Sequence, residues 1–205
     1  MQYIQLKKAF KDFVTFTQQD IKNFDGSFCR QNLHEWQKKG YIKKVTKGYY
    51  VFSELEITDP ILFTIANEIY KPSYISFESA LSYYHLIPEI IHGIISVNSK
   101  DTYKFKTYLG NFIYKKVKPN LMFGYNFVKH SNHVFKIAEA EKAILDFFYI
   151  KPHLKELEDF EELRIDKESF FEQVNLKKLE KYTEAFKNMT LAKRIKKFVR
   201  YIKNA

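Results

Sequence analysis

The first 52 residues restrict what this chain can fold into more than any other segment, because helical spacing gives way to strand spacing at one glycine. Up to Gly40, apolar residues recur every three or four positions. After Gly40, the runs 41–45 and 49–52 are rich in β-branched and aromatic residues. Gly48 lies between them and permits the positive φ of a tight turn. The pattern predicts helices followed by a two-stranded hairpin.

Three helices are expected before the hairpin. The first places Tyr3, Leu6, Phe10 and Phe13 on one face. The second begins after Thr17, with Asp20 completing a capping box, and is expected to bury Ile21 and Phe24. Ser27 is expected to cap the third, which Gly40 ends. Three helices and a hairpin are typical of a winged helix-turn-helix domain.

The third helix is predicted to have a buried side and a polar side. At about 100° per residue, Cys29, Leu33 and Trp36 form one apolar stripe. Arg can bind guanine, and Gln can bind adenine, through paired hydrogen bonds in the major groove. The residues predicted to lie in the major groove are Arg30, Gln31, His34 and Lys38. The alternative is an ordinary solvated face.

The hairpin is predicted to grip the DNA backbone, because lysines neutralise phosphates without reading sequence. The predicted wing residues are Lys43, Lys44 and Lys47. Charge agrees, since residues 1–52 hold 10 Lys and Arg against 4 Asp and Glu, and residues 189–205 hold 6 basic residues and no acid. A polyanion is the first expected partner, and an anionic membrane surface the second.

Composition narrows the class of protein. A single cysteine, Cys29, excludes an intrachain disulfide, and zinc-ligand spacing is absent. The sequence shows no signal peptide and no apolar run long enough for a membrane span. We therefore expect a soluble cytoplasmic protein without metal or cofactor.

The middle of the chain is predicted to form a small sheet packed by helices, an α+β arrangement. Helices are expected from Asp59, acting as the cap, to Tyr70, over Phe77–Leu86 and over Ala138–Tyr149, with a short extended segment at 74–76. The predicted strands are Ile90–Val97, Tyr103–Tyr108, Phe112–Val117, Tyr125–Lys129 and His133–Ile137.

Several polar residues of this region invite a catalytic or metal-binding interpretation, but simpler ones are preferred. His130 and His133 flank a predicted turn, and His85 is expected to be a packed or capping residue. The charged residues of the last helix are expected to point outward or to cap; they are Glu139, Glu141, Lys142 and Asp146. Phosphate loops and the common hydrolase motifs are missing, so an enzyme is not expected.

The C-terminal helix is predicted over residues 191–202, with Thr190 as its cap. Its apolar stripe comprises Leu191, Ile195, Phe198, Val199 and Ile202. A second basic surface is considered at Lys193, Arg194, Lys196, Lys197 and Arg200. The helix could dock on the core with a basic outer side, contact nucleic acid or a toxin, or lie on a membrane surface.

Three segments resemble one family. Pro72 to Leu86 follows the pattern Pro-Ser-Tyr-Ile-Ser-x-x-Ser-Ala-Leu-x-Tyr-x-x-Leu, residues 141–146 read Glu-Lys-Ala-Ile-Leu-Asp, and Gly48-Tyr49-Tyr50 closes the hairpin. Together they resemble the AbiEi-type antitoxins and transcriptional regulators of type IV toxin–antitoxin systems. The resemblance implies a DNA-binding repressor of its own operon that counters a nucleotidyltransferase-like toxin encoded beside it.

The leading hypothesis is therefore a two-part α+β protein. Residues 1–52 would bind promoter DNA as a winged helix-turn-helix, and residues 59–205 would form an antitoxin-type domain with a small mixed sheet and C-terminal helices over 153–205. Two alternatives stay open: a non-catalytic interaction module whose winged helix packs against protein, and an RNA-binding protein that stacks bases on exposed tyrosines.

Overall fold

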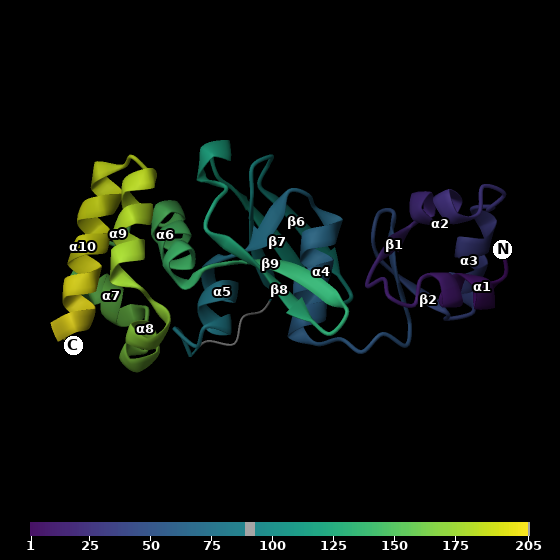
Figure 1. Cartoon of the computed structure of the whole chain (residues 1–205), viewed down its shortest axis with the longest axis horizontal. Coiled ribbons are helices and arrows are strands. Elements are labelled where there is room, and N and C mark those ends of the chain that lie inside the picture. The colour runs from purple at the N-terminus through teal and green to yellow at the C-terminus, as the bar shows by residue number, and fades with distance from the viewer. Residues whose placement is uncertain (89–92, 205) are drawn as a thin grey trace.

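The computed structural model describes residues 1–88 and 93–204. The chain is elongated, with the N-terminal helices at one end, a six-stranded sheet in the middle and the C-terminal helices at the other end (Figure 1). The two termini lie at opposite ends of the long axis. The fold is α+β with mixed strand pairing and a helical C-terminal tail, as the sequence predicts.

The N-terminal unit contains three helices and a small antiparallel sheet in the strand order β1-β3-β2. Its elements are α1 (Tyr3–Ala9), β1 (Phe16–Thr17), α2 (Gln18–Phe24), α3 (Gln31–Lys38), β2 (Ile42–Thr46) and β3 (Tyr49–Phe52). The predicted hairpin is confirmed, with Gly48 at φ +86° in its turn. The capping box between Thr17 and Asp20 is also confirmed. Strand β1 was not predicted.

Some predicted core positions in this unit are wrong. Cys29 is exposed and Phe28 is buried in its place, because α3 begins only at Gln31 and residue 29 lies before the helix. Ser27 does not cap α3; its hydroxyl and its backbone N–H both donate to Asp25. Phe24, the last residue of α2, is 64% exposed, and Phe13 is 49% exposed because α1 ends at Ala9, before the predicted position.

The central unit is built on a six-stranded sheet in the order β6-β7-β5-β4-β9-β8. Two neighbouring pairs, β4 with β9 and β5 with β7, are parallel, and the other three are antiparallel. The elements are α4 (Asp59–Ile69), β4 (Ser73–Ile75), α5 (Phe77–Tyr83), β5 (Ile94–Asn98), β6 (Tyr103–Thr107), β7 (Gly110–Lys116), the 3-10 turn η1 (Pro119–Leu121), β8 (Tyr125–His130) and β9 (His133–Ala138).

The five predicted strands are found close to their predicted positions, although residues 90–92 of the first lie outside the described residues. Thr58, rather than Asp59, is the N-cap residue of α4. Helix α5 stops at Tyr83 because the chain turns at His85, which has a φ of +56°. His85 is exposed, so its predicted packing role is wrong, but its predicted capping role is confirmed: its backbone N–H donates to the Ser82 carbonyl, and that of Leu86 donates to Leu81.

The tail consists of α6 (Ala140–Ile150), α7 (Leu157–Glu162), α8 (Lys167–Gln173), α9 (Leu176–Ala185) and α10 (Met189–Asn204). Helix α10 packs against α6, α7 and α9. Its predicted apolar side is confirmed: Leu191, Ile195, Phe198 and Ile202 are buried. Thr190 lies inside the helix and does not cap it, since the Asn188 side chain accepts the backbone N–H of Leu191.

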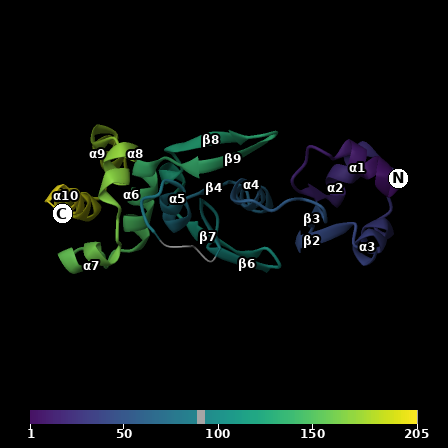
Figure 2. The same ribbon diagram turned by 90° about the horizontal axis from the view of Figure 1, so that it is seen from below.

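The N-terminal and central units contact each other through the back of the hairpin. Val14, Val45 and Val51 belong to the buried cluster of the central unit rather than to that of the helices around α3. The turns at the ends of β6–β7 and β8–β9 both reach toward the N-terminal unit (Figure 2). Residues 53–58, which connect the units, form neither helix nor strand.

Candidate nucleic-acid interface

Helix α3 is anchored on one side only. Leu33 and Trp36 are 2% and 6% exposed, and the indole ring packs against the rings of Phe28 and Tyr3 at centroid distances of 5.6 and 6.0 Å. Four residues of the opposite side are exposed, and these are the predicted major-groove residues Arg30, Gln31, His34 and Lys38. The inner anchor fixes which side of the helix remains open.

Three of these four side chains share one surface hollow with a lysine of the hairpin. Arg30, Gln31 and His34 line the hollow from α3, and Lys44 lines it from β2, with Tyr50 beside it. Glu35 also lines it, so the surface carries an acidic group among its donors. Lys38, one turn beyond His34, stays outside. We call Arg30, Gln31, His34 and Lys44 the α3–β2 surface.

The three hairpin lysines lie at different places on the N-terminal unit. Lys44 pairs across the sheet with Tyr50, whereas Lys43 pairs with Val51, and successive strand residues point to opposite faces. The Lys43 ammonium lies 5.5 Å from the ring centroid of Tyr108 in the central unit. Lys47 is exposed in the turn. The structure thus brings Lys44 to α3, and Lys43 to the junction between the units.

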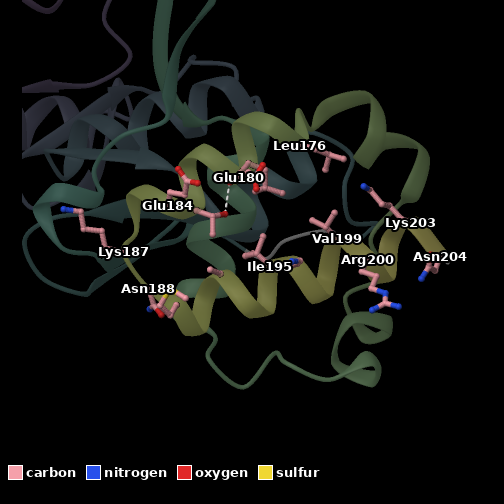
Figure 3. A pocket seen from close by; sticks show the side chains of 15 residues that line it. Leu176, Glu180, Glu184, Lys187, Asn188, Ile195, Val199, Arg200, Lys203 and Asn204 are labelled. Carbon is pink, nitrogen blue, oxygen red and sulfur yellow. Dashed lines mark hydrogen bonds between the residues drawn. The ribbon is translucent and has the colours of Figure 1, made fainter.

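The five residues of the considered C-terminal basic surface are dispersed. Arg194 is buried, and its Nη1 donates to the backbone carbonyls of Lys151 and Leu154 at 3.0 and 3.2 Å, so its inclusion in an exposed surface is wrong. Lys197 forms an ion pair with Glu156 at 2.6 Å. Lys196 and Arg200 line a groove between α9 and α10, seen in Figure 3, and Lys193 is exposed outside it.

The predicted outward charges of α6 are also corrected. Glu141 is 4% exposed, and Lys142 and Asp146 are fully buried. Lys142 donates from Nζ to Oδ1 of Asp146, and to the Tyr74 hydroxyl at 2.8 Å. The hydroxyls of Tyr74 and Ser76 donate to Oδ2 of Asp146 at 3.0 and 2.9 Å. We call these four residues the Lys142–Asp146 cluster.

Burial dominates the electrostatics of this cluster. Desolvation lowers the pKa of Lys142 and raises the pKa of Asp146, and their mutual attraction opposes both shifts. The rings of Phe186 and Phe123 lie 5.0 and 5.1 Å from the lysine Nζ. Fully enclosed side chains have no access to a substrate, so this cluster stabilises the packing of α6 against β4 and is not a reaction centre.

The Lys142–Asp146 cluster joins two of the segments on which the resemblance rests. Tyr74 and Ser76 come from the segment 72–86, and Lys142 and Asp146 come from the segment 141–146. The sequence carried one signal of this burial: a lysine and an aspartate four residues apart within a helix whose residues from 143 to 150 are otherwise apolar or aromatic. Both segments therefore contribute to packing of the central unit.

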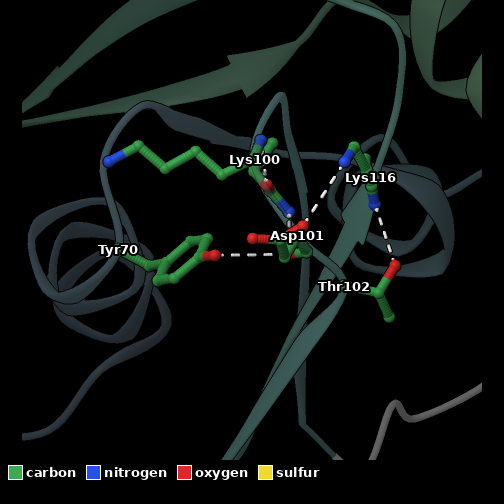
Figure 4. Close-up of polar contacts among 6 residues, drawn as sticks. Tyr70, Lys100, Asp101, Thr102 and Lys116 are labelled. Atoms are coloured by element: carbon green, nitrogen blue, oxygen red, sulfur yellow. Dashed lines mark hydrogen bonds and ion pairs between the residues drawn. The ribbon is translucent and has the colours of Figure 1, made fainter.

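A second polar group, around Asp101, supports a loop (Figure 4). The Asp101 carboxylate pairs with Lys116 at 3.3 Å, its carbonyl accepts from the Tyr70 hydroxyl, and Thr102 accepts the backbone N–H of Lys116. Both charged side chains are mostly exposed. These contacts hold the connection between β5 and β6 against β7.

The part of the chain that the structure describes shows neither a metal-binding cluster nor a membrane-spanning helix. Within residues 1–88 and 93–204, no three His, Cys, Asp or Glu side chains lie close enough together to hold a metal ion. None of the helices described there combines the length and apolar character needed to cross a bilayer. His130 and His133 face each other across the β8–β9 turn, as predicted.

Comparison with known proteins adds no relative to this picture. No family model matches the chain, and no curated protein matches it.

Proposed function

We propose that this protein is a DNA-binding transcriptional regulator whose residues 1–52 act as a winged helix-turn-helix. The observation that carries the proposal is the α3–β2 surface: Arg30, Gln31 and His34 surround one hollow together with Lys44. All four side chains are exposed: Arg30, Gln31 and His34 come from the start and first turn of α3, and Lys44 comes from β2, with the buried Leu33 also lining the hollow. A guanidinium, an amide, an imidazole and an ammonium are suited to base edges and phosphates.

The order of elements supports this role. Helices α2 and α3 are followed directly by the β2–β3 hairpin, and β1 completes the sheet beside β3. An α-helix such as α3 has a diameter of about 10–12 Å with its side chains, which is close to the roughly 12 Å width of the DNA major groove. In the proposed complex, α3 enters the major groove and the hairpin lies over the adjacent backbone.

The lysines receive different roles in this proposal. Lys44 would contact a phosphate at the edge of the groove that α3 occupies, and Lys47 would contact the next one from the hairpin turn. Lys38 would reach the backbone from the last turn of α3. Lys43, held near Tyr108, would reach DNA only if the duplex passes across the junction with the central unit.

The biological role that we propose follows the family resemblance. The protein would be a cytoplasmic, non-catalytic autorepressor without a cofactor, acting as the antitoxin of a type IV toxin–antitoxin system. Its partners would be its own promoter and, functionally, a nucleotidyltransferase-like toxin from the same operon. The neighbouring open reading frame tests this directly: a nucleotidyltransferase there supports the antitoxin role, and its absence leaves only the regulator.

Titration of two labelled duplexes tests DNA binding, one carrying the upstream region of the gene and one a shuffled sequence. Affinity should fall steeply between about 50 and about 200 mM salt, because bound lysines and arginines release counterions. Arg30→Ala should weaken binding to the upstream duplex by about 1–3 kcal/mol and reduce the preference over the shuffled one. Lys47→Ala should weaken both duplexes equally.

Lys181→Ala is the matched control, since Lys181 is exposed and lies on α9, away from the N-terminal unit and outside the considered basic surface. It should leave both affinities and the salt response unchanged. A flat salt response, or equal losses on both duplexes in Arg30→Ala, would contradict base reading by α3. Retention of a protein partner by such a variant would then favour the interaction-module alternative.

A further inference from the structure

Helices α9 and α10 leave an apolar groove open on their outer side. The two helices form an antiparallel hairpin joined by residues 186–188. The groove has a volume of about 830 Å³, and its apolar lining includes Leu176, Ala192, Ile195 and Val199 (Figure 3). Met189, at the loop end, is 75% exposed. An apolar strip of this kind is a site for another helical surface.

The two rims of the groove carry opposite charges. Glu180 and Glu184 line it from α9, whereas Lys196, Arg200 and Lys203 line it from α10. All five side chains are exposed. Within residues 1–88 and 93–204, the ion pairs of these helices use other residues, namely Lys178 with Glu139 and Lys197 with Glu156. The rim charges are thus available to a partner.

We propose that this groove is the contact surface of a homodimer, in which α9 of each protomer lies over α10 of its partner. A surface with one acidic and one basic rim is complementary to a second copy of itself. The proposal depends on the tail alone and does not rest on DNA binding by the N-terminal unit. Most soluble oligomers are two-fold dimers with self-complementary interfaces.

The charges also select the orientation. Two hairpins can pack face to face about a two-fold axis that runs either along the helices or across them. An axis across the helices would place α9 on α9 and bring Glu180 and Glu184 toward their own copies. An axis along the helices places α9 on α10, so that acidic rims meet basic rims. Like charges in contact are unfavourable, so the second arrangement is preferred.

The positions of the charged residues along the axes of α9 and α10 identify which two of them face each other across the proposed interface. Glu180 lies about 7.5 Å along α9 from Ala185, and Lys196 lies about 10.5 Å along α10 from Met189, at 1.5 Å per residue. Measured from the shared loop, the two positions differ by about 3 Å, less than one helical turn. A two-fold axis along the helices preserves these positions, so Glu180 of one protomer faces Lys196 of its partner, twice per dimer.

Analytical ultracentrifugation of the full chain over a concentration series tests the proposal. The protein should show a monomer–dimer equilibrium. Glu180→Lys should raise the dimer Kd by about tenfold or more, because each reversal replaces two attractions with two repulsions. Lys196→Glu should do the same. The double variant Glu180→Lys/Lys196→Glu restores opposite charges in both pairs and should return the Kd toward that of the original protein.

Lys193→Glu is the control, because it makes the same charge change on α10 outside the groove and should leave the Kd unchanged. Circular dichroism of each variant establishes that the helices are retained. A monomer at every concentration would overturn the proposal and leave the groove for a different protein. A dimer that withstands both single reversals, or one that the double variant fails to restore, would also overturn it.

Discussion

Helices α3 and α6 both carry charged residues between apolar ones, but they place those charges in opposite environments. On α3, His34, Glu35 and Lys38 are exposed, and the helix is held through Leu33 and Trp36. On α6, Lys142 and Asp146 are fully buried and bonded to each other and to β4 and the residue after it. The difference lies in what covers each helix.

Helix α3 rests on one layer, whereas α6 is covered by α5 and also by α9 and α10. A helix covered on one side can leave its polar residues in water at no cost. A helix covered on several sides must provide partners for every charge that it buries. A charged side chain on a helix can therefore be assigned a functional role only when it is known whether that side chain is exposed or buried.

The largest expected effect on the free energy of unfolding comes from removing one charge of the buried Lys142–Asp146 pair. Asp146→Asn removes the charge that balances Lys142 while keeping nearly the same shape. Because an uncompensated buried charge remains, the free energy of unfolding should fall by about 3–5 kcal/mol in urea titration. The double variant Lys142→Met/Asp146→Leu removes both charges and should cost less than Asp146→Asn alone. A loss below about 0.5 kcal/mol in Asp146→Asn would mean that the pair does not brace the fold.

The next effect concerns two arginines of α10 that differ only in burial. Arg194 donates to two backbone carbonyls, and Arg200 lies on the rim of the groove. Arg194→Met should lower the free energy of unfolding by about 1–3 kcal/mol, because buried carbonyls lose their donor. Arg200→Met should change it by less than about 0.5 kcal/mol. Equal losses in the two variants, measured below the concentration of association, would contradict this assignment.

A smaller effect, a pH dependence of the free energy of unfolding, is expected from the junction between the units. The Glu68 carboxylate accepts the N–H and the hydroxyl of Thr15 at 3.2 and 2.5 Å, and burial raises the pKa of Glu68 despite these bonds. The folded state therefore keeps this proton to higher pH than the unfolded state does. The contribution of Glu68 to stability is full below the unfolded pKa and is lost as pH rises through the folded pKa.

Glu68→Gln removes this dependence. The free energy of unfolding of the original protein should fall relative to that of Glu68→Gln as the pH rises from 4 to 7. Urea titrations of both proteins at several pH values measure the difference. Glu54→Gln is a control with an exposed carboxylate. Parallel profiles for the original protein and Glu68→Gln would show that Glu68 is ionised equally in both states.

The smallest effect on stability is expected on α3. Arg30→Ala and His34→Ala remove exposed side chains and should each change the free energy of unfolding by less than about 0.5 kcal/mol. Thermal and urea unfolding can measure this. The same substitutions matter for DNA binding if the proposed function holds. A large loss of stability in either would mean that these side chains serve the fold.

Much of the fold was predictable from local patterns. The hairpin around Gly48, the five later strands and the apolar side of α10 all follow from spacing and turn residues. Strand β1 was not predictable, because two residues have no periodicity and pair with β3 only after the chain has folded back. The prediction that Cys29 is buried was wrong, because no clear sequence pattern marks the start of α3, which has no side-chain cap.

The candidate site was predictable only in part, because local patterns indicate which side of a helix is exposed but not which tertiary contacts form. Exposure of Arg30, Gln31 and His34 follows from the position of Trp36 on the other side of α3. The separation of Lys43 from Lys44 depends on which face of the hairpin meets the central unit, a tertiary contact that no local pattern records. Burial of Arg194 likewise depends on a tertiary contact, with the backbone carbonyls of Lys151 and Leu154.

The shared valines at the back of the hairpin have a consequence for how the protein comes apart. A protease that cuts the connecting segment 53–58 would sever the chain, yet Val14, Val45 and Val51 would still adhere to the central unit. The nicked halves should travel together through gel filtration and separate only in denaturant. A fragment ending at residue 52 would instead expose those three side chains to water, and it should self-associate.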